Sequence, residues 1–400
     1  MRRKKHTKKP LPNDHQGPYE VNRALPNDAY GPSNRQLEHE YKKRTRSWKT
    51  ILKRTLIIIV TIVLLGALWV GFKFGWNLAK IFGWKNLTTA LLPTKLKGEN
   101  TGRVNILLAG NSADDSGHAG ANLTDSIMVV SVDTKNNTAF LLSIPRDLYV
   151  SIPNNGYAKI NETYQDGEND NFSESGYPKG GMGLLEKVVS QKLGLTIHYY
   201  ALVDYAALEN AVNAVGGITV NIQSSDPRGL YDPSLDLKTG KPLVDLSNGT
   251  QTLNGRAALN LSRARGNSYY SYGFPLSDFN RTQNQRMILI GLKDKATSVS
   301  TLSNPAKLGE LADSFGDNVK TDMQLKEVRR LYSIIKKVKN SDIKSEGLNS
   351  ANGKNLLGSY RTSSGQSALV PAAGLDDYTE IQAFITQLTT PPKTDTKGSQ

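Results

Sequence analysis

The chain has 400 residues, which is enough for one large domain or two ordinary ones with a substantial core. Its net charge of +14 is unevenly distributed: residues 1–54 contain 15 Lys and Arg against 5 Asp and Glu, and so carry +10 of that charge. A nucleic-acid-binding domain would spread basic residues over a folded surface, so this distribution argues against a nucleic acid partner. The lack of cysteine excludes disulfides, thiolate nucleophiles and cysteine metal sites.

The N-terminal part has the composition of a tail followed by a membrane anchor. Residues 1–54 are basic and poor in apolar residues, which predicts a disordered tail. Residues 55–76 begin with TLIIIVTIVLLGALWVGF, 18 residues without a charge, nearly the length that spans a bilayer. A cleaved signal peptide is the alternative, but the preceding region is too long for one and no small-residue cleavage site follows. We therefore expect a single-pass signal anchor in the cell membrane, with a cytoplasmic tail and an extracellular remainder.

Residues 77–100 are predicted to connect the anchor to one domain, 101–388, and residues 389–400 to form a disordered tail. Two polar loops are expected, at 111–125 and 153–180. Hydrophobic periodicity places strands at 104–110, 126–133, 138–144, 198–204 and 218–222, and helices at 181–194, 205–217, 254–265, 278–296 and 321–338.

The second and third strands are joined by TKNN, which predicts an antiparallel hairpin. Asp204 is the expected N-cap of the helix that follows it, and Thr321 or Asp322 that of the last helix. Because strands and helices alternate, the fold class is α/β. We expect a three-layer αβα sandwich around a mixed central sheet, preceded by one transmembrane helix.

Several kinds of chemistry are excluded by missing motifs. There is no G-x-S-x-G elbow, no Walker A loop, no dinucleotide glycine fingerprint and no pair of histidines at zinc-ligand spacing. Three of the five histidines lie in the N-terminal tail. His198 falls in an apolar strand and is expected to be structural, whereas His118 lies in the first polar loop and is a weak candidate for a base.

Carboxylates and arginines remain as candidates. Asp125 precedes the second strand, and Arg146 and Asp147 follow the third. Two further groups share a face by spacing, in an extended segment or on a helix respectively: Arg263 with Arg265, and Arg281 with Gln285. If these guanidinium groups meet at the strand ends they would suit a diphosphate, which arginine binds in a bidentate fork. Scattered surface arginines are the alternative that spacing alone leaves open.

Five stretches occur in the order seen in the LytR–CpsA–Psr (LCP) family, and the chain resembles that family over about residues 101–290. The stretches are LTDSIMVVSVDTKNNTAFLLSIPRDLYVSIP, AKINETY, AVNAVGGITVNI, LNGRAALNLSRARG and FNRTQNQ. The resemblance implies the family's αβα fold around a polyprenyl pyrophosphate. It also implies transfer of a glycan-phosphate from that lipid carrier to a peptidoglycan hydroxyl.

Position by position, the resemblance implies a role for most of the candidates. Asp125 matches a carboxylate that helps to hold a divalent metal, Mg²⁺ or Mn²⁺, on the phosphates. Lys159 and Asn161 belong to a family motif expected to shape the site rim, together with Asp147. The expected pyrophosphate contacts are Arg146, Arg263, Arg265, Arg281 and Gln285, and the catalytic set is Asp125, Arg146, Arg263 and Arg265.

Two positions depart from the family pattern. Leu123 stands where the family often has arginine, which is expected to weaken one phosphate contact. After the first strand the chain reads GNS where the family often has Gly-x-Asp, a second metal ligand, so Asp114 or Asp115 is expected to replace it. The general base stays open between Asp147 and the acids of the 111–125 loop.

The sequence therefore predicts a membrane-anchored phosphotransferase whose partners are a polyprenyl-pyrophosphate-linked glycan, peptidoglycan and the bilayer. Two alternatives remain. One is a non-enzymatic membrane regulator or lipid-glycan-binding receptor that uses the same arginines without turnover. The other is a lipid pyrophosphatase, in which water replaces the acceptor hydroxyl.

Overall fold

The computed structural model describes residues 92–112, 122–298, 318–351 and 353–390, together with Thr61. The predicted tails and most of the predicted anchor lie outside these ranges, as do Asp114, Asp115 and His118. Among the described residues, no helix has both the length and the apolar character needed to cross a membrane. The anchor and the domain boundaries therefore stay predictions.

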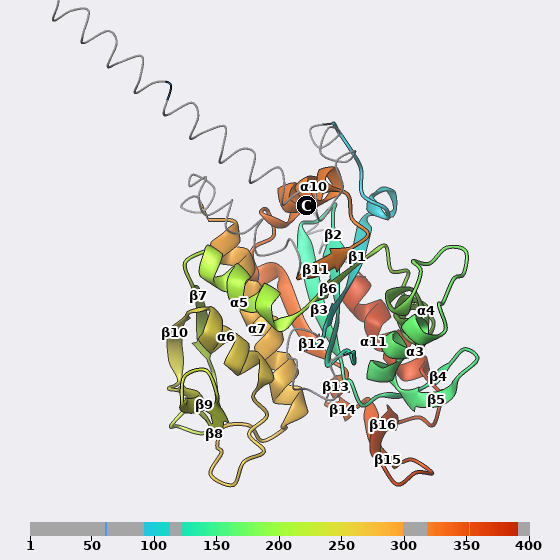
Figure 1. The fold of residues 1–400 in the computed structure, drawn as a ribbon. Coiled ribbons are helices and arrows are strands. Elements are labelled where there is room, and N and C mark those ends of the chain that lie inside the picture. Colours follow the sequence, from blue (N-terminus) through green and yellow to red (C-terminus); the bar gives the residue numbers. More distant parts are fainter. Residues whose placement is uncertain (1–60, 62–91, 113–121, 299–317, 352, 391–400) are drawn as a thin grey trace, which may run out of the picture. The chain divides into compact units, whose positions relative to one another are not determined.

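A six-stranded mixed sheet forms the centre of the fold (Figure 1). Strands β1, β3, β6 and β12 run parallel to one another, and β2 and β11 run the opposite way. The predicted hairpin of β2 and β3 is confirmed. Across the sheet the order is β11 (Val319–Thr321), β6 (Tyr199–Val203), β1 (Arg103–Gly110), β2 (Ser126–Asp133), β3 (Thr138–Ile144) and β12 (Ile343–Gly347).

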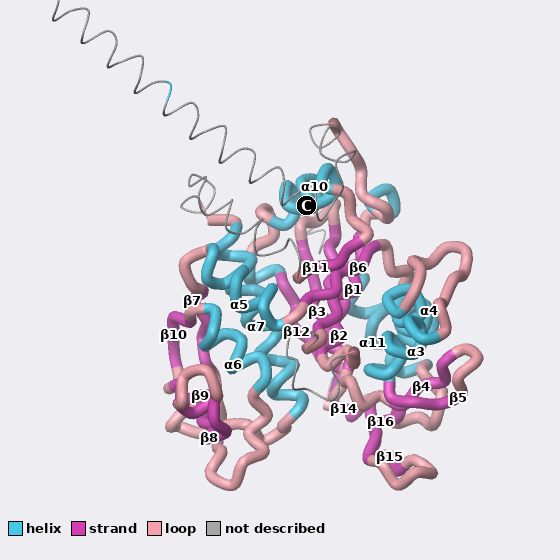
Figure 2. Tube along the Cα trace, viewed as in Figure 1, coloured by secondary structure: helices cyan, strands magenta, loops and turns pink. Residues whose placement is uncertain are grey.

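Alternate residues of the central strands face opposite sides, and helices cover both (Figure 2). Leu107 and Ile127 pack in the core cluster that contains residues of α4 and α11, whereas Val104 and Ile106 pack in the cluster that includes Ile334 of α10. An α/β fold with a mixed sheet is therefore confirmed. The helices in the described residues are α3 (Thr163–Asn169), α4 (Gly181–Leu193) and α11 (Thr379–Thr389) on one side, α5 (Tyr205–Ala214), α6 (Gly255–Arg263) and α7 (Asp278–Ala296) on the other, and α10 (Leu325–Ile335).

In the described parts of the chain, five two-stranded sheets surround this centre. The predicted strand 218–222 forms, but as β7 it pairs with β10 and lies outside the central sheet, because its buried residues pack with α6 and α7. The pairs are β4 (Tyr149–Ile152) with β5 (Gly156–Lys159), β7 (Ile218–Ile222) with β10 (Gly249–Leu253), β8 (Leu230–Asp236) with β9 (Lys241–Leu246), β13 (Ser350–Ala351) with β14 (Lys354–Asn355), and β15 (Leu357–Arg361) with β16 (Ser367–Pro371).

Two further predictions were wrong. The stretch 153–180 is not simply a polar loop, since it contains β5 and α3. Ile160 and Tyr164 hold this stretch in the core, at 1% and 6% exposure. Two buried apolar residues are too few to produce a hydrophobic periodicity in the sequence. The last helix is capped by Gln324 in a capping box with Glu327. Thr321 is instead paired in β11.

The predicted N-cap at Asp204 and the predicted helix end at Gly194 are confirmed. Asp204 caps α5, accepting a hydrogen bond from the Ala207 amide at 2.8 Å. Gly194 ends α4 at a φ of 65°, a conformation that a glycine adopts without a steric penalty.

His198 is structural, as expected. Its Nδ1 accepts a hydrogen bond from the backbone amide of Asn105 at 3.0 Å, and burial lowers the pKa of the imidazole.

A buried carboxyl on α4 makes stability depend on pH. Glu186 is 5% exposed, and burial, reinforced by Asp322, raises its pKa from 4.5 to about 7. In the unfolded chain the Glu186 carboxyl loses its proton near pH 4.5, whereas in the folded chain it keeps that proton up to about pH 7. The free energy of unfolding therefore falls as pH rises from about 4.5 to 7. Glu186→Gln should remove this fall, roughly 1–3 kcal/mol in chemical denaturation at pH 4.5 and 8. Glu380→Gln is the control, because Glu380 is only partly buried, and an unchanged pH profile in Glu186→Gln would contradict the prediction.

Candidate functional site

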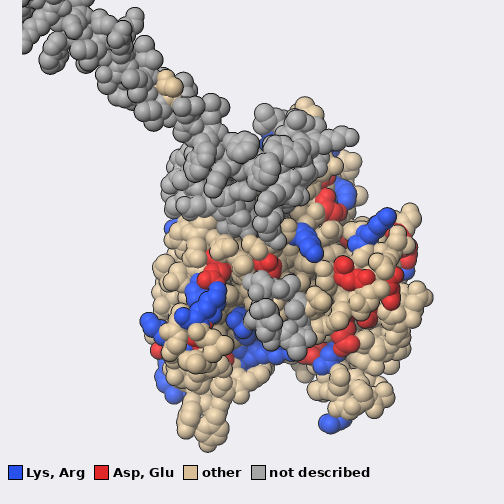
Figure 3. All heavy atoms as spheres, in the orientation of Figure 1, with Lys and Arg blue, Asp and Glu red and all other residues tan. Residues whose placement is uncertain are grey.

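The predicted site residues come together at one edge of the central sheet. The carboxyl ends of β1, β3 and β6 meet there with the start of β2, which is where sites in such sheets commonly open. Asp125 directly precedes β2, and Arg146 lies two residues beyond the end of β3. In the space-filling view, basic side chains gather across the lower middle of the face, near the start of α7 (Figure 3).

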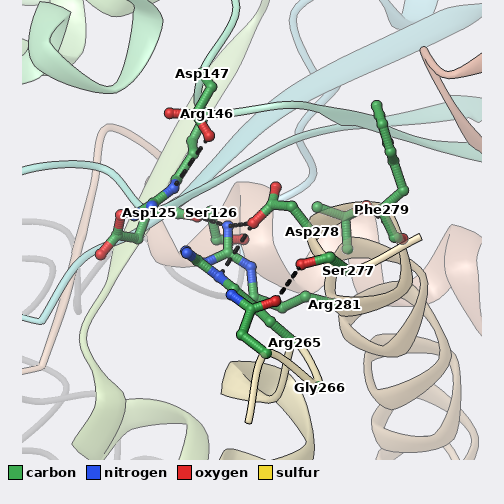
Figure 4. A network of polar contacts seen from close by, with 12 residues as sticks. Asp125, Ser126, Arg146, Asp147, Arg265, Gly266, Ser277, Asp278, Phe279 and Arg281 are labelled. Atoms are coloured by element: carbon green, nitrogen blue, oxygen red, sulfur yellow. Dashed lines mark hydrogen bonds and ion pairs between the residues drawn. The ribbon is translucent and has the colours of Figure 1, made fainter. Parts of the chain in front are cut away.

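Two carboxylates hold three arginines in one network (Figure 4). Arg146 forms a close ion pair with Asp125. Asp278 Oδ1 lies 2.9 Å from Arg281 Nη2 and 3.2 Å from Arg265 Nε. Arg281 Nη2 also donates to the backbone oxygen of Asp125 at 2.8 Å, which joins the two halves of the network. Arg146, Arg265 and Arg281 therefore converge although more than 110 residues separate the first from the other two.

Three arginines meet two carboxylates here, which leaves positive charge in excess around Arg281. Its side chain is buried, with the residue 5% exposed. Burial and the neighbouring charges of Arg265 and Arg146 lower its pKa to about 10, against the opposing effect of Asp278. Within the described residues, the Nε atoms of Arg146 and Arg281 are buried and have no hydrogen-bond partner. A cavity wall with several guanidinium groups and surplus positive charge suits an anion such as a phosphate.

The remaining two predicted contacts lie beside this network. The guanidinium of Arg263, the last residue of α6, stacks 4.9 Å from the ring centre of Tyr205. Gln285, one turn after Arg281 on α7, accepts from the Ser126 hydroxyl at 2.9 Å and donates to the Ser262 oxygen at 3.0 Å. These contacts place Gln285 between the start of β2 and the end of α6.

All five predicted pyrophosphate contacts line one cavity of about 370 Å³ between the sheet and helices α5, α6 and α7. Its lining is polar where Asp125, Asn111 and the arginines lie. Further along α7 it becomes apolar. The apolar lining residues are Leu108, Met128, Val203, Leu208, Ile288, Leu289 and Leu292. The cavity therefore offers an anion site that continues into an apolar chamber.

The three predicted rim residues do not line this cavity. Asp147 Oδ1 pairs with Lys159 Nζ at 2.8 Å, and its Oδ2 lies 3.7 Å from Arg146 Nε. Asn161 is buried and acts through its backbone: its oxygen accepts the Thr124 amide at 3.1 Å and its amide donates to the Arg146 oxygen at 3.3 Å. Asn161 thus fixes the two segments that carry Asp125 and Arg146. Asp147 is a weaker candidate for a base, because both its oxygens face cations.

The metal-ligand set is only partly visible. Asp125 reaches the cavity, but no group of three His, Cys, Asp or Glu side chains that could hold a metal occurs in the described parts of the chain. Asp114 and Asp115, the expected second ligands, lie outside them. One carboxylate that already pairs with Arg146 makes an incomplete ligand set.

Asp278 is the functional candidate that reading the sequence missed. It begins α7 and lies three residues before Arg281, a spacing that predicts contact on a helix. Its second partner, Arg265, comes from the preceding segment, so the local pattern did not reveal that Asp278 bridges two arginines. Ser126 and Tyr205 were missed as well, and neither carries a distinctive signal in sequence.

Comparisons with known proteins give one consistent relationship. The LytR_cpsA_psr family model matches residues 85–370. A relative from Oceanobacillus iheyensis, named polyisoprenyl-teichoic acid–peptidoglycan teichoic acid transferase TagU, is 32% identical over 58% of this chain and 62% of its own length. A Staphylococcus aureus relative named regulatory protein MsrR is 29% identical over 56% of this chain and 58% of its own. The match thus spans less than two thirds of each relative.

A solved structure described as TagT bound to LIIa-WTA has the same fold. It matches with a TM-score of 0.52 and 26% sequence identity, over 74% of this chain and 94% of that one. The match therefore extends well beyond the sheet edge that carries the arginines.

Proposed function

Because this chain belongs to the LytR–CpsA–Psr family, we propose that it transfers a glycan-phosphate from a polyprenyl-pyrophosphate carrier to a peptidoglycan hydroxyl. The observation that carries the proposal is the arginine cluster in one part of a cavity whose remaining wall is apolar. The arginines suit the pyrophosphate, and the apolar chamber suits the start of the polyprenyl chain. The name of the TagU relative and the TagT structure described as bound to LIIa-WTA support this choice.

The proposed reaction is a phosphoryl transfer that the arginine cluster assists. The acceptor oxygen attacks the glycan-linked phosphorus, and the bond from that phosphorus to the bridging oxygen breaks. Polyprenyl phosphate leaves with the bridging oxygen, and the hydroxyl proton passes to a base. Arg146, Arg265 and Arg281 hold the phosphoryl oxygens as negative charge develops on them, and such positioning and neutralisation supply most of the catalysis in phosphoryl transfer.

We also propose that Mg²⁺ or Mn²⁺ binds beside the phosphates, with one ligand from Asp125 and a second from Asp114 or Asp115. A bound divalent cation would add further positive charge to the phosphoryl oxygens. Asp125 supports the proposal because it lines the cavity next to Arg146.

One assay separates transfer from its alternatives. The full chain in detergent micelles is given polyprenyl-pyrophosphate glycan with labels on both the glycan and its phosphate, peptidoglycan sacculi and magnesium. Transfer puts both labels into the sacculi. Hydrolysis releases glycan-phosphate into solution. Label that only co-purifies with the protein would favour a receptor or regulator, the role suggested by the name of the MsrR relative.

The proposal includes a membrane topology. Residues 55–76 form a single-pass anchor, the N-terminal tail is cytoplasmic and the domain is extracellular. It rests on the uncharged stretch that follows a strongly basic tail. Protease added to cells stripped of their wall should degrade the domain beyond residue 77 and spare a tag on the N-terminus. A cytoplasmic protein is the control for leakage, and a protected domain would overturn the assignment.

A further inference from the structure

Three tyrosines outside the cavity form a stack that the proposed reaction does not use. The ring of Tyr149 lies 5.6 Å from that of Tyr157 and 5.5 Å from that of Tyr360, with 27° between the planes in each pair. Tyr157 and Tyr360 are 44% and 36% exposed, so part of each ring can be reached from solvent. We call Tyr149, Tyr157 and Tyr360 the tyrosine platform.

A chain of contacts links the platform to the arginine site. In β4, Val150 and Ile152 point into the core, so Tyr149 lies on the opposite, outward face. The partner of Tyr149 across the hairpin is Lys159. Lys159 pairs with Asp147, which lies beside Arg146. The outward face of the β4–β5 hairpin therefore leads from Arg146 to the three rings.

Contacts behind the rings hold the platform in place. The Tyr157 hydroxyl donates to Asp376, which also pairs with Lys192 Nζ at 2.7 Å. Lys192 Nζ donates to Ser151 Oγ at 2.7 Å. The β15–β16 hairpin, which supplies Tyr360, lies beside β4 in Figures 1 and 2. The Leu369 amide joins this hairpin to the residues just before β4, because it donates to the Asp147 oxygen at 2.9 Å. Rings ordered in advance lose little entropy when a ligand binds.

The charges around the tyrosine platform differ from those of the arginine cluster. The two lysines beside the platform are each matched by a carboxylate, Lys159 by Asp147 and Lys192 by Asp376. A balanced face has little preference for an anion, in contrast to the arginine cluster. Aromatic rings stack on the CH faces of sugar rings, and neighbouring hydroxyl, lysine and carboxylate groups can bond to sugar hydroxyls. The ligand class that fits best is an uncharged stretch of polysaccharide.

We infer that the tyrosine platform binds the sugar chain of the acceptor and so delivers its hydroxyl to the phosphorus held at Arg146. This inference rests on the proposed function, in which the lipid carrier occupies the apolar cavity. The acceptor must then approach over another surface, and the β4–β5 face is linked to the arginine site.

The test measures sugar binding without turnover. The full chain in detergent micelles is mixed with intact peptidoglycan sacculi, or with glycan strands stripped of their peptides, and binding is measured by co-sedimentation or size exclusion. Tyr157→Ala and Tyr360→Ala should each weaken binding to both probes by about tenfold, the loss typical of a central aromatic contact. Tyr157→Phe keeps the ring and should bind nearly as well as the original chain.

Tyr269→Ala is the matched control, because Tyr269 is 93% exposed and lies on a different loop. The inference is overturned if the alanine variants bind both probes normally, or if Tyr269→Ala weakens binding equally. Binding of sacculi without binding of stripped strands would overturn it in favour of peptide recognition. Loss of binding in Tyr157→Phe with unchanged thermal unfolding would also overturn it, because that variant keeps the ring face.

The fates of the two proposals can be told apart. If the tyrosine variants lose glycan binding but the original chain transfers no label to sacculi, the platform stands and the transferase proposal fails. If transfer occurs and the tyrosine variants leave the acceptor KM unchanged, the transferase proposal stands and the platform is only structural. A platform used in catalysis should raise the acceptor KM and leave the affinity for the lipid carrier unchanged.

Discussion

Replacing Arg146, Arg263 or Arg265 with alanine should weaken binding of lipid pyrophosphate, or its turnover, roughly ten- to a hundredfold. In the proposed site each guanidinium would supply a charge-assisted contact to phosphate, worth on the order of 1.5–3 kcal/mol. Lysine should restore only part of the loss, because an ammonium keeps the charge without the bidentate fork. Affinity is measured with labelled polyprenyl pyrophosphate on the full chain in micelles, alongside thermal unfolding.

Arg281→Ala should show the same loss and also lower stability. Arg281 is buried and contacts both Asp278 and the Asp125 backbone, so its removal leaves buried groups without partners. Arg281→Lys keeps a cation beside Asp278 and tests binding in a better-folded protein.

The control for all four is Arg329→Ala, on the exposed side of α10, where a substitution usually changes stability by less than about 0.5 kcal/mol. Arg330 is unsuitable as a control, because it is ion-paired with the largely buried Glu99. Site variants that bind like Arg329→Ala would show that the arginines are ordinary surface charge, and the receptor or regulator proposal would then lead.

Asp125→Asn should abolish magnesium-dependent transfer. The change removes the carboxylate proposed to bind the cation and leaves Arg146 without its closest partner. Metal binding is measured independently of transfer activity, by titrating Mn²⁺ and following its electron paramagnetic resonance signal. The affinity for Mn²⁺ should fall at least tenfold in Asp125→Asn, and Asp114→Asn or Asp115→Asn should also lower it.

Asp278→Asn is the matched control for metal binding. It removes a carboxylate from the same arginine network but has no proposed role as a ligand. Asp278→Asn should therefore keep its affinity for Mn²⁺. The metal proposal fails if Asp125→Asn binds Mn²⁺ as tightly as the original chain does. Silent substitutions at both Asp114 and Asp115 would leave Asp125 as the only protein ligand among those proposed.

Much of the fold could be read from the sequence because its signals are local. The apolar runs that became β1, β2 and β3, and the short TKNN link between two of them, are complete within a few residues. The caps at Asp204 and Gly194 are local in the same way. Prediction was wrong for 153–180 because that stretch is held by isolated buried residues, Ile160 and Tyr164, which leave no periodic pattern.

For the candidate site, the sequence by itself determined which residue types were available and which could share a face. Spacing placed Gln285 beside Arg281 on one helix, and the motif order pointed to the family.

The sequence does not show which strands join the central sheet. The β7 segment has the pattern of the other strands, but it pairs with β10 because its apolar residues pack against α6 and α7. Propensity does not encode the choice of partner.

Only the tertiary structure decided how the charges are paired. It made Asp278 the bridge between Arg265 and Arg281, tied Asp147 to Lys159, and placed the backbone of Asn161 between the segments of Asp125 and Arg146. These contacts join segments that are far apart in sequence, or depend on which way a side chain turns at the end of a helix. Their strength comes from burial and from distances of about 3 Å. Both exist only once the sheet and its helices have packed.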